Sequence, residues 1–122
     1  MKSLFAVGLL SVGLLSMNGE LTGSWKITGE VQGVPIDDAC ALVHADAKLT
    51  GSCMMGGKQY ETIGSVDGKK VTLKHGGEYN GDPLTLTFTG VLADDGSIAG
   101  SIMVDPLNVD GSFSAKKAVA AK

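Results

Sequence analysis

The chain has 122 residues, which is enough for one domain, and 18 of them are glycine while only three are proline. Its formal net charge is -3, and all ten basic residues are lysine. Because arginine supplies most bidentate contacts to phosphate and guanine, and an acidic chain gains nothing from a polyanion, this composition argues against nucleic-acid binding.

The first 19 residues have the composition of a secretory signal. Lys2 provides a positive charge, and residues 3–19 carry no charge and are largely apolar. Glycine and serine interrupt the apolar run, which is shorter than the ~20 residues of a spanning helix. We expect a signal peptide over residues 1–19, with a retained apolar anchor as the alternative. A cleaved signal implies a periplasmic or secreted protein with no stable membrane insertion.

Alternation of apolar and polar residues at a period of two predicts eight strands after the signal. They are expected near residues 23–32, 39–44, 48–55, 59–66, 70–75, 84–92, 98–104 and 109–115. An up-and-down sheet of this length with one apolar face is expected to curl and close, because closure removes both edges. The sequence therefore predicts an all-β fold, an eight-stranded antiparallel up-and-down β-barrel over residues 20–117, with a flexible tail over residues 118–122.

Cys40 and Cys53 are the only cysteines. If the hairpin turn lies midway between them, they face each other on adjacent strands, so we expect a disulfide. It would close a loop of about 14 residues, for which chain entropy gives ~3 kcal/mol. The alternatives are two free thiols, or a Cu(I) site formed with His44 and Met54 or Met55. That spacing matches no standard motif, so no metal is expected.

Candidate catalytic groups are sparse. His44 and His75 are the only histidines, and neither has a serine or an acid at a known triad spacing. Two adjacent aspartate pairs lie at residues 37–38 and 94–95. Neighbours in a strand point to opposite faces, so neither pair can easily act on one substrate bond. Both are interpreted as solvated turns; calcium is the alternative, but the oxygen spacing of an EF-hand loop is missing. We expect no catalytic residue and no cofactor, and an enzyme remains a weaker alternative.

The inward positions of the expected strands are almost wholly apolar, which leaves two interpretations of the interior. In the first, the interior is a packed core and the protein is a non-catalytic structural or interaction module. In the second, inward glycines leave a pocket for a small lipophilic ligand, although glycines can equally mark barrel corners. The pocket would be lined by Trp25, Ile27, Leu42, Leu73, His75, Leu86, Phe88, Ile102 and Phe113. The remaining residues assigned to the inward face are Leu49, Ile63, Val71, Leu84, Leu92, Ile98 and Val109.

The run Gly23-Ser24-Trp25 opens the first expected strand and carries the only tryptophan. A Gly-x-Trp first strand followed by a meander resembles the calycin-like barrels, which include lipocalins, avidins and small exported bacterial barrels of unassigned activity. The resemblance covers nearly all of the chain after residue 20. It implies a basic side chain, Lys116 or Lys117, packed over Trp25. A single tryptophan argues against a biotin site of the avidin kind.

The outward positions of the sixth and seventh strands carry no charge. A soluble monomer usually mixes charges over its surface, so this wall predicts a homo-oligomer. The alternative is that threonine-rich strands follow β-propensity on a solvated face. The wall consists of Thr85, Thr87, Thr89, Val91, Ser97, Ala99, Ser101 and Met103.

Overall fold

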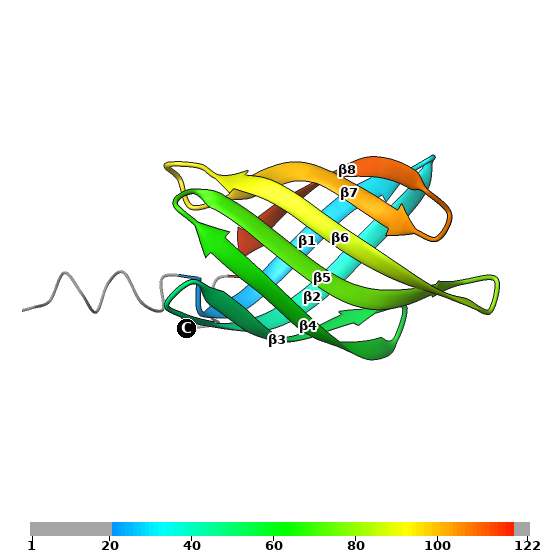
Figure 1. Ribbon diagram of the computed structural model, residues 1–122, viewed down its shortest axis with the longest axis horizontal. Helices are drawn as coiled ribbons and strands as arrows, with labels where there is room; N and C mark the ends of the chain where they lie inside the picture. The colour runs from blue at the N-terminus through cyan, green and yellow to red at the C-terminus, as the bar shows by residue number, and fades with distance from the viewer. Residues whose placement is uncertain (1–20, 119–122) are drawn as a thin grey trace, which may run out of the picture.

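The computed structural model describes residues 21–118 as a closed antiparallel barrel of eight strands (Figure 1). Each strand pairs with the next one, and the last pairs with the first, so no edge is left unpaired. The expected fold class is confirmed, and the barrel is consistent with a calycin-like fold. The strands are β1 (Gly23–Val31), β2 (Val34–Ala45), β3 (Lys48–Met55), β4 (Lys58–Asp67), β5 (Lys70–Tyr79), β6 (Asp82–Leu92), β7 (Ile98–Asp105) and β8 (Val109–Lys117).

The expected signal peptide over residues 1–19 lies outside the described residues, as do residues 119–122 of the expected tail. Between residues 21 and 118, no helix has the length and apolar character needed to cross a membrane.

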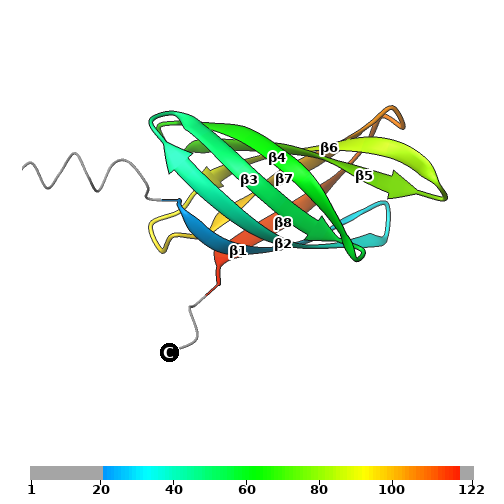
Figure 2. The same cartoon turned by 90° about the horizontal axis from the view of Figure 1, so that it is seen from below.

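The two ends of the barrel differ. The described chain enters and leaves at the closed end, where the Ala118 amide donates a hydrogen bond to the Ser24 carbonyl at 2.7 Å. The β1–β2, β3–β4, β5–β6 and β7–β8 turns lie together at the other end, the open end, where the β5–β6 hairpin reaches furthest out (Figures 1 and 2). Asn80 and Gly81 form this hairpin's turn with φ of 53° and 84°, as a type I′ turn requires.

The two aspartate pairs have different environments. Asp94 and Asp95 form the expected solvated turn, where the hydroxyl and amide of Ser97 both donate to Asp95 and hold the pKa of its carboxyl below the ordinary value. The same expectation for Asp37 and Asp38 is wrong. β2 begins five residues before the expected position and includes both, so Asp37 points outward while Asp38 is completely buried.

The register of β4 corrects one expected inward residue. Ile63 is 57% exposed, whereas its neighbour Thr62 is completely buried. The β3–β4 pairing sets Gly51 opposite Thr62 and Cys53 opposite Tyr60, so the even-numbered positions of β4 point into the barrel. A β-branched isoleucine on the solvated face is compatible with a strand, but it contributes nothing to the core.

The inward glycines mark close backbone approaches. A Cβ on Gly51 would lie 1.9 Å from the Ala41 carbonyl oxygen, and a Cβ on Gly100 would lie 1.9 Å from that of Thr89. Gly100 pairs directly with Gly90. These glycines therefore let adjacent strands approach where the sheet curls, and of the two interpretations the barrel corner is the one observed.

Aromatic side chains hold the core together. Trp25, Leu86, Phe88, Ile102 and Phe113 are each at most 6% exposed and belong to one cluster, as expected. The rings of Phe88 and Phe113 meet edge to face with centroids 5.3 Å apart, a favoured geometry for an aromatic pair.

The central position of Phe88 predicts a large effect on stability. Phe88→Ala should lower the free energy of unfolding by about 3–5 kcal/mol, because it removes a fully buried ring and leaves a cavity. Val91→Ala, on the outer face of the same strand and 59% exposed, should cost less than about 1 kcal/mol. Urea unfolding measures both, and equal midpoints for the two variants would contradict this packing.

The uncharged outer wall of β6 and β7 is present in the structure. The pairs Thr87–Met103, Thr89–Ser101 and Val91–Ala99 lie side by side there and point outward. Self-association through this wall stays a prediction. Thr87→Lys should convert a dimer to a monomer by introducing a charge into the contact, and multi-angle light scattering at high micromolar protein measures it. A monomeric wild type, or a dimer that the lysine leaves intact, would contradict it.

Candidate functional site

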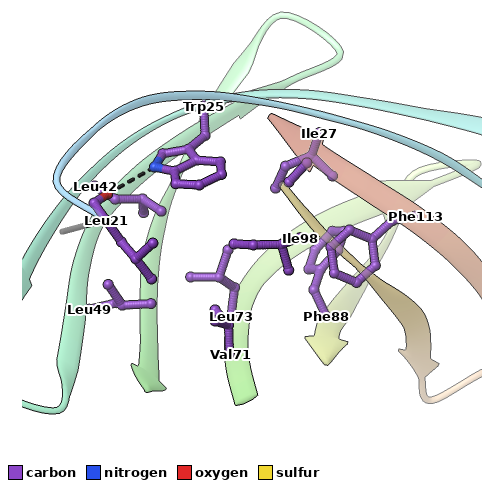
Figure 3. A pocket seen from close by; sticks show the side chains of 11 residues that line it. Leu21, Trp25, Ile27, Leu42, Leu49, Val71, Leu73, Phe88, Ile98 and Phe113 are labelled. Carbon is purple, nitrogen blue, oxygen red and sulfur yellow. Dashed lines mark hydrogen bonds between the residues drawn. The ribbon is translucent and has the colours of Figure 1, made fainter. Parts of the chain in front are cut away.

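The interior of the barrel is divided into a packed half and an open half. In the packed half, next to the closed end, apolar side chains leave a void of only about 10 Å³ (Figure 3). A void of that size is at the lower limit for a single water, so this half cannot take an organic ligand. The side chains around it are those of Leu21, Trp25, Ile27, Leu42, Leu49, Val71, Leu73, Phe88, Ile98, Phe113 and Ala115.

Leu21 closes this end of the barrel, just before β1. Its amide donates to Nδ1 of His44 at 3.2 Å, and its carbonyl accepts a hydrogen bond from the Trp25 indole at 2.8 Å (Figure 3). Nε2 of His44 lies 2.9 Å from the Asp46 carbonyl, to which it must donate. With one nitrogen accepting and the other donating, the His44 ring is neutral and structural. The ammonium of Lys117 lies 6.0 Å from the Trp25 ring, which is the basic contact implied by the resemblance.

The open half contains a cavity of about 610 Å³ that reaches the turns of the open end. Its walls are mostly aliphatic, and its polar groups belong to residues in or beside the turns. This volume falls within the range of ~300–1,000 Å³ that small-molecule pockets occupy. The lining residues are Val31, Gln32, Val34, Pro35, Ile36, Asp37, Met55, Gly56, Lys58, Tyr60, Glu78, Tyr79, Leu84, Leu86, Val104, Leu107 and Val109.

An ion pair lies at the mouth of the cavity. Nζ of Lys58 is 3.0 Å from Oε1 of Glu78, and both side chains are partly exposed. The hydrogen bond and the negative charge of Glu78 raise the pKa of the Lys58 ammonium above its ordinary value, so Lys58 stays protonated at neutral pH. The mouth therefore presents one cation and one anion to a polar group of an incoming molecule.

Between the two halves, a buried polar pair spans the interior. Nε2 of His75 on β5 lies 2.6 Å from Oδ2 of Asp38 on β2, and both side chains are completely inaccessible. The His75 ring is flanked by Tyr60, which lines the cavity, and Phe88, which lines the packed half, with centroids 5.8 and 5.4 Å away. The pair therefore lies beneath the floor of the cavity.

The hydrogen bonds of His75 fix its proton count. Nδ1 faces the carbonyl oxygen of Gly76, which can only accept, so Nδ1 carries a proton. Nε2 and the Asp38 carboxyl then share one further proton, and the pair is neutral overall whichever atom holds it. Because both ring nitrogens are engaged, His75 has no free lone pair for a substrate, and the pair is not arranged as a general base.

The expected disulfide is confirmed. Cys40 and Cys53 are bonded to each other from paired positions on β2 and β3, with Cα atoms 4.0 Å apart. A carboxylate oxygen of Asp38 and both sulfurs lie within 4.8 Å of one another. Within residues 21–118, Oδ1 of Asp38 has no hydrogen-bond partner. In this oxidised state the sulfurs offer no thiolate to a metal, and His44 of the rejected Cu(I) set bonds to Leu21 at the closed end.

The residues expected to line a ligand pocket fall in different places. Leu86 lines the open cavity. Ile102 is completely buried in the core, and His75 belongs to the polar pair. The others surround the packed half: Trp25, Ile27, Leu42, Leu73, Phe88 and Phe113.

Sequence reasoning missed Asp38 and the residues around the cavity mouth. A signal for Asp38 was present, because it lies an even number of residues before Cys40, Leu42 and His44 and is inward if the expected strand is extended backward by one residue. Comparison of the sequence with protein-family models and with curated proteins finds no match.

The buried pair predicts non-additive stability effects. Asp38→Ala should lower the free energy of unfolding by about 3–5 kcal/mol, because it leaves the His75 ring without its partner inside the barrel. A double-mutant cycle uses Asp38→Leu, His75→Phe and the two combined. The double variant should lose less unfolding free energy than the sum of the two single variants, since it leaves no buried polar group without a partner. Urea unfolding of the four proteins in this cycle measures the coupling, and strictly additive effects would contradict it.

Proposed function

We propose that the protein binds a small lipophilic molecule in the open half of its barrel. The observation that carries this proposal is the cavity of about 610 Å³, which has mainly aliphatic walls and opens between the turns. Burial of an apolar molecule there removes its surface from water at ~25 cal/mol per Å², which is the general driving force for such binding.

The position of the polar groups supports an amphiphilic occupant. Leu84, Leu86 and Val104 form part of the apolar wall, so a hydrocarbon part of the molecule fits the interior. Lys58 and Glu78 lie at the mouth and favour a polar head group there, where it keeps contact with water. Tyr60 also lines the cavity and adds an aromatic ring with a hydroxyl group.

The alternative function, a structural or interaction module with a packed interior, is supported by the half next to the closed end. The void of about 10 Å³ there has no room for a ligand. A fully packed interior does not account for the cavity of about 610 Å³ in the open half, so the carrier function is preferred. Export to the periplasm or the outside of the cell remains part of the proposal, supported by the buried disulfide and by the signal-like first 19 residues.

A cavity-filling variant tests the function. Ile36→Trp on β2 points into the cavity and should weaken binding of an anilinonaphthalene sulfonate dye by at least about tenfold, because the indole takes the volume the dye needs. Val43→Trp lies on the outer face of the same strand, 55% exposed, and should leave binding within about twofold. Fluorescence titration measures both, and native mass spectrometry of the unlabelled protein detects a co-purified lipophile.

Two outcomes would contradict the proposed function. One is a wild-type protein that neither binds the dye at a single site nor retains any lipophile. The other is an equal loss of binding in Ile36→Trp and Val43→Trp, which would place the dye on the outer surface.

A further inference from the structure

We propose that the barrel contains a redox-gated Zn²⁺ site, formed by Asp38, Cys40, Cys53 and His75 when the disulfide is reduced. The site is separate from the ligand cavity and does not depend on the proposed carrier function. It would supply four ligands from β2, β3 and β5, which meet inside the barrel next to the cavity floor.

The positions of the ligand atoms support the site. An oxygen of Asp38 and the sulfurs of Cys40 and Cys53 all lie within 4.8 Å of one another, and Nε2 of His75 is 2.6 Å from Oδ2 of Asp38. Zinc–ligand bonds of ~2.0–2.3 Å in a tetrahedron separate the ligand atoms by about 3.3–3.8 Å. His75 lies beside Asp38 but outside the group of atoms within 4.8 Å, so zinc binding requires the two sulfurs to part and the His75 ring to move toward them.

The unpaired oxygen of Asp38 is a second, independent observation. Oδ1 is completely buried and has no hydrogen-bond partner in the described part of the chain. Most buried polar atoms are satisfied, and an exception calls for an explanation such as an ion. A cation beside the sulfurs would satisfy this oxygen and leave the carboxylate charged.

His75 is already held in the orientation of a metal ligand. Its Nδ1 donates to the Gly76 carbonyl, which is the usual outer contact of a histidine that binds metal through Nε2. Tyr60 and Phe88 flank the ring. The proton between Nε2 and Asp38 has to leave before Nε2 can coordinate.

The chemistry of the four ligands selects zinc. Two thiolates, one imidazole and one carboxylate are borderline-soft donors that suit tetrahedral Zn²⁺. Calcium and magnesium bind through oxygen alone, so they do not fit a site with two sulfurs.

Reduction of the disulfide between Cys40 and Cys53 is balanced when a dithiol is the reductant. The dithiol passes two electrons and two protons to the sulfurs of Cys40 and Cys53, whose bond breaks, and becomes a disulfide itself. Zinc binding then releases the two thiol protons and the proton shared by Asp38 and His75, and zinc keeps its oxidation state.

The cavity provides the entry path. Met55 pairs with Asp38, and Tyr60 pairs with Cys53, and both of these partners line the cavity. Movement of the flexible Met55 side chain would expose the polar pair and the disulfide to a molecule in the open half. The sulfurs are otherwise inaccessible, since Cys40 is 4% exposed and Cys53 is 0% exposed.

The test uses the full protein after reduction with a phosphine, which does not bind zinc strongly. Reduced wild type should bind one equivalent of Zn²⁺ in competition with a chromophoric chelator, and Co²⁺ in its place should show sulfur-to-cobalt charge-transfer absorption. The oxidised protein should bind none. Asp38→Asn should weaken zinc binding by at least ~tenfold, whereas Asp110→Asn, exposed on the outer face of β8, should not change it.

Other outcomes would overturn the proposal. Reduced protein with two titrating thiols that binds no zinc would do so, and so would a Cys40→Ser, Cys53→Ser double variant that binds zinc as tightly as wild type. X-ray absorption of the zinc complex should show two sulfur ligands and two nitrogen or oxygen ligands, and any other number of sulfurs rejects the site. This measurement also decides the question if Asp38→Asn does not fold. If reduction unfolds the protein, zinc should restore its strand circular dichroism, and failure to do so rejects the site.

Discussion

The buried contact between Asp38 and His75 separates the packed half of the barrel interior from the open half. It joins β2 to β5 across the lumen, and no other hydrogen bond between side chains of the described residues is buried in this way. Burying two ionisable groups is costly, and the cost is tolerable here because the pair shares one proton and is neutral. On one side of it the side chains pack to exclude water, and on the other side the walls stay apart.

Much of the fold could be predicted from the sequence because its signals are local. Period-two alternation locates the strands, and two cysteines equidistant from a turn must face each other if the strands pair there. Alternation alone puts Asp38 on the inward side of β2, but an acidic residue next to Asp37 and close to Pro35 indicates a turn, so the sequence predicts a strand that starts after it. Its partner is 37 residues away, and only the closed barrel brings the two together.

The cavity is also a property of the whole barrel. Its existence depends on how far the inward side chains at the open end reach. The space beside Gly77 is already filled, since a Cβ there would lie within 3 Å of the ends of Leu86 and Met55. One interpretation of the sequence places empty space at the inward glycines of β1, β3, β6 and β7. Those positions are filled by the backbone of the neighbouring strand, so removing a side chain there creates curvature and no volume.

The pairing of β1 with β8 has a consequence for how the chain acquires its structure. Seven of the eight strand pairings join neighbours in the chain and need only short loops to close. The eighth joins residues such as Trp25 and Lys117, which are separated by nearly the whole domain. A chain without β8 would leave β1 and β7 with one unpaired edge each. Closure of the barrel therefore removes the two edges at which another chain could pair, and it requires β8.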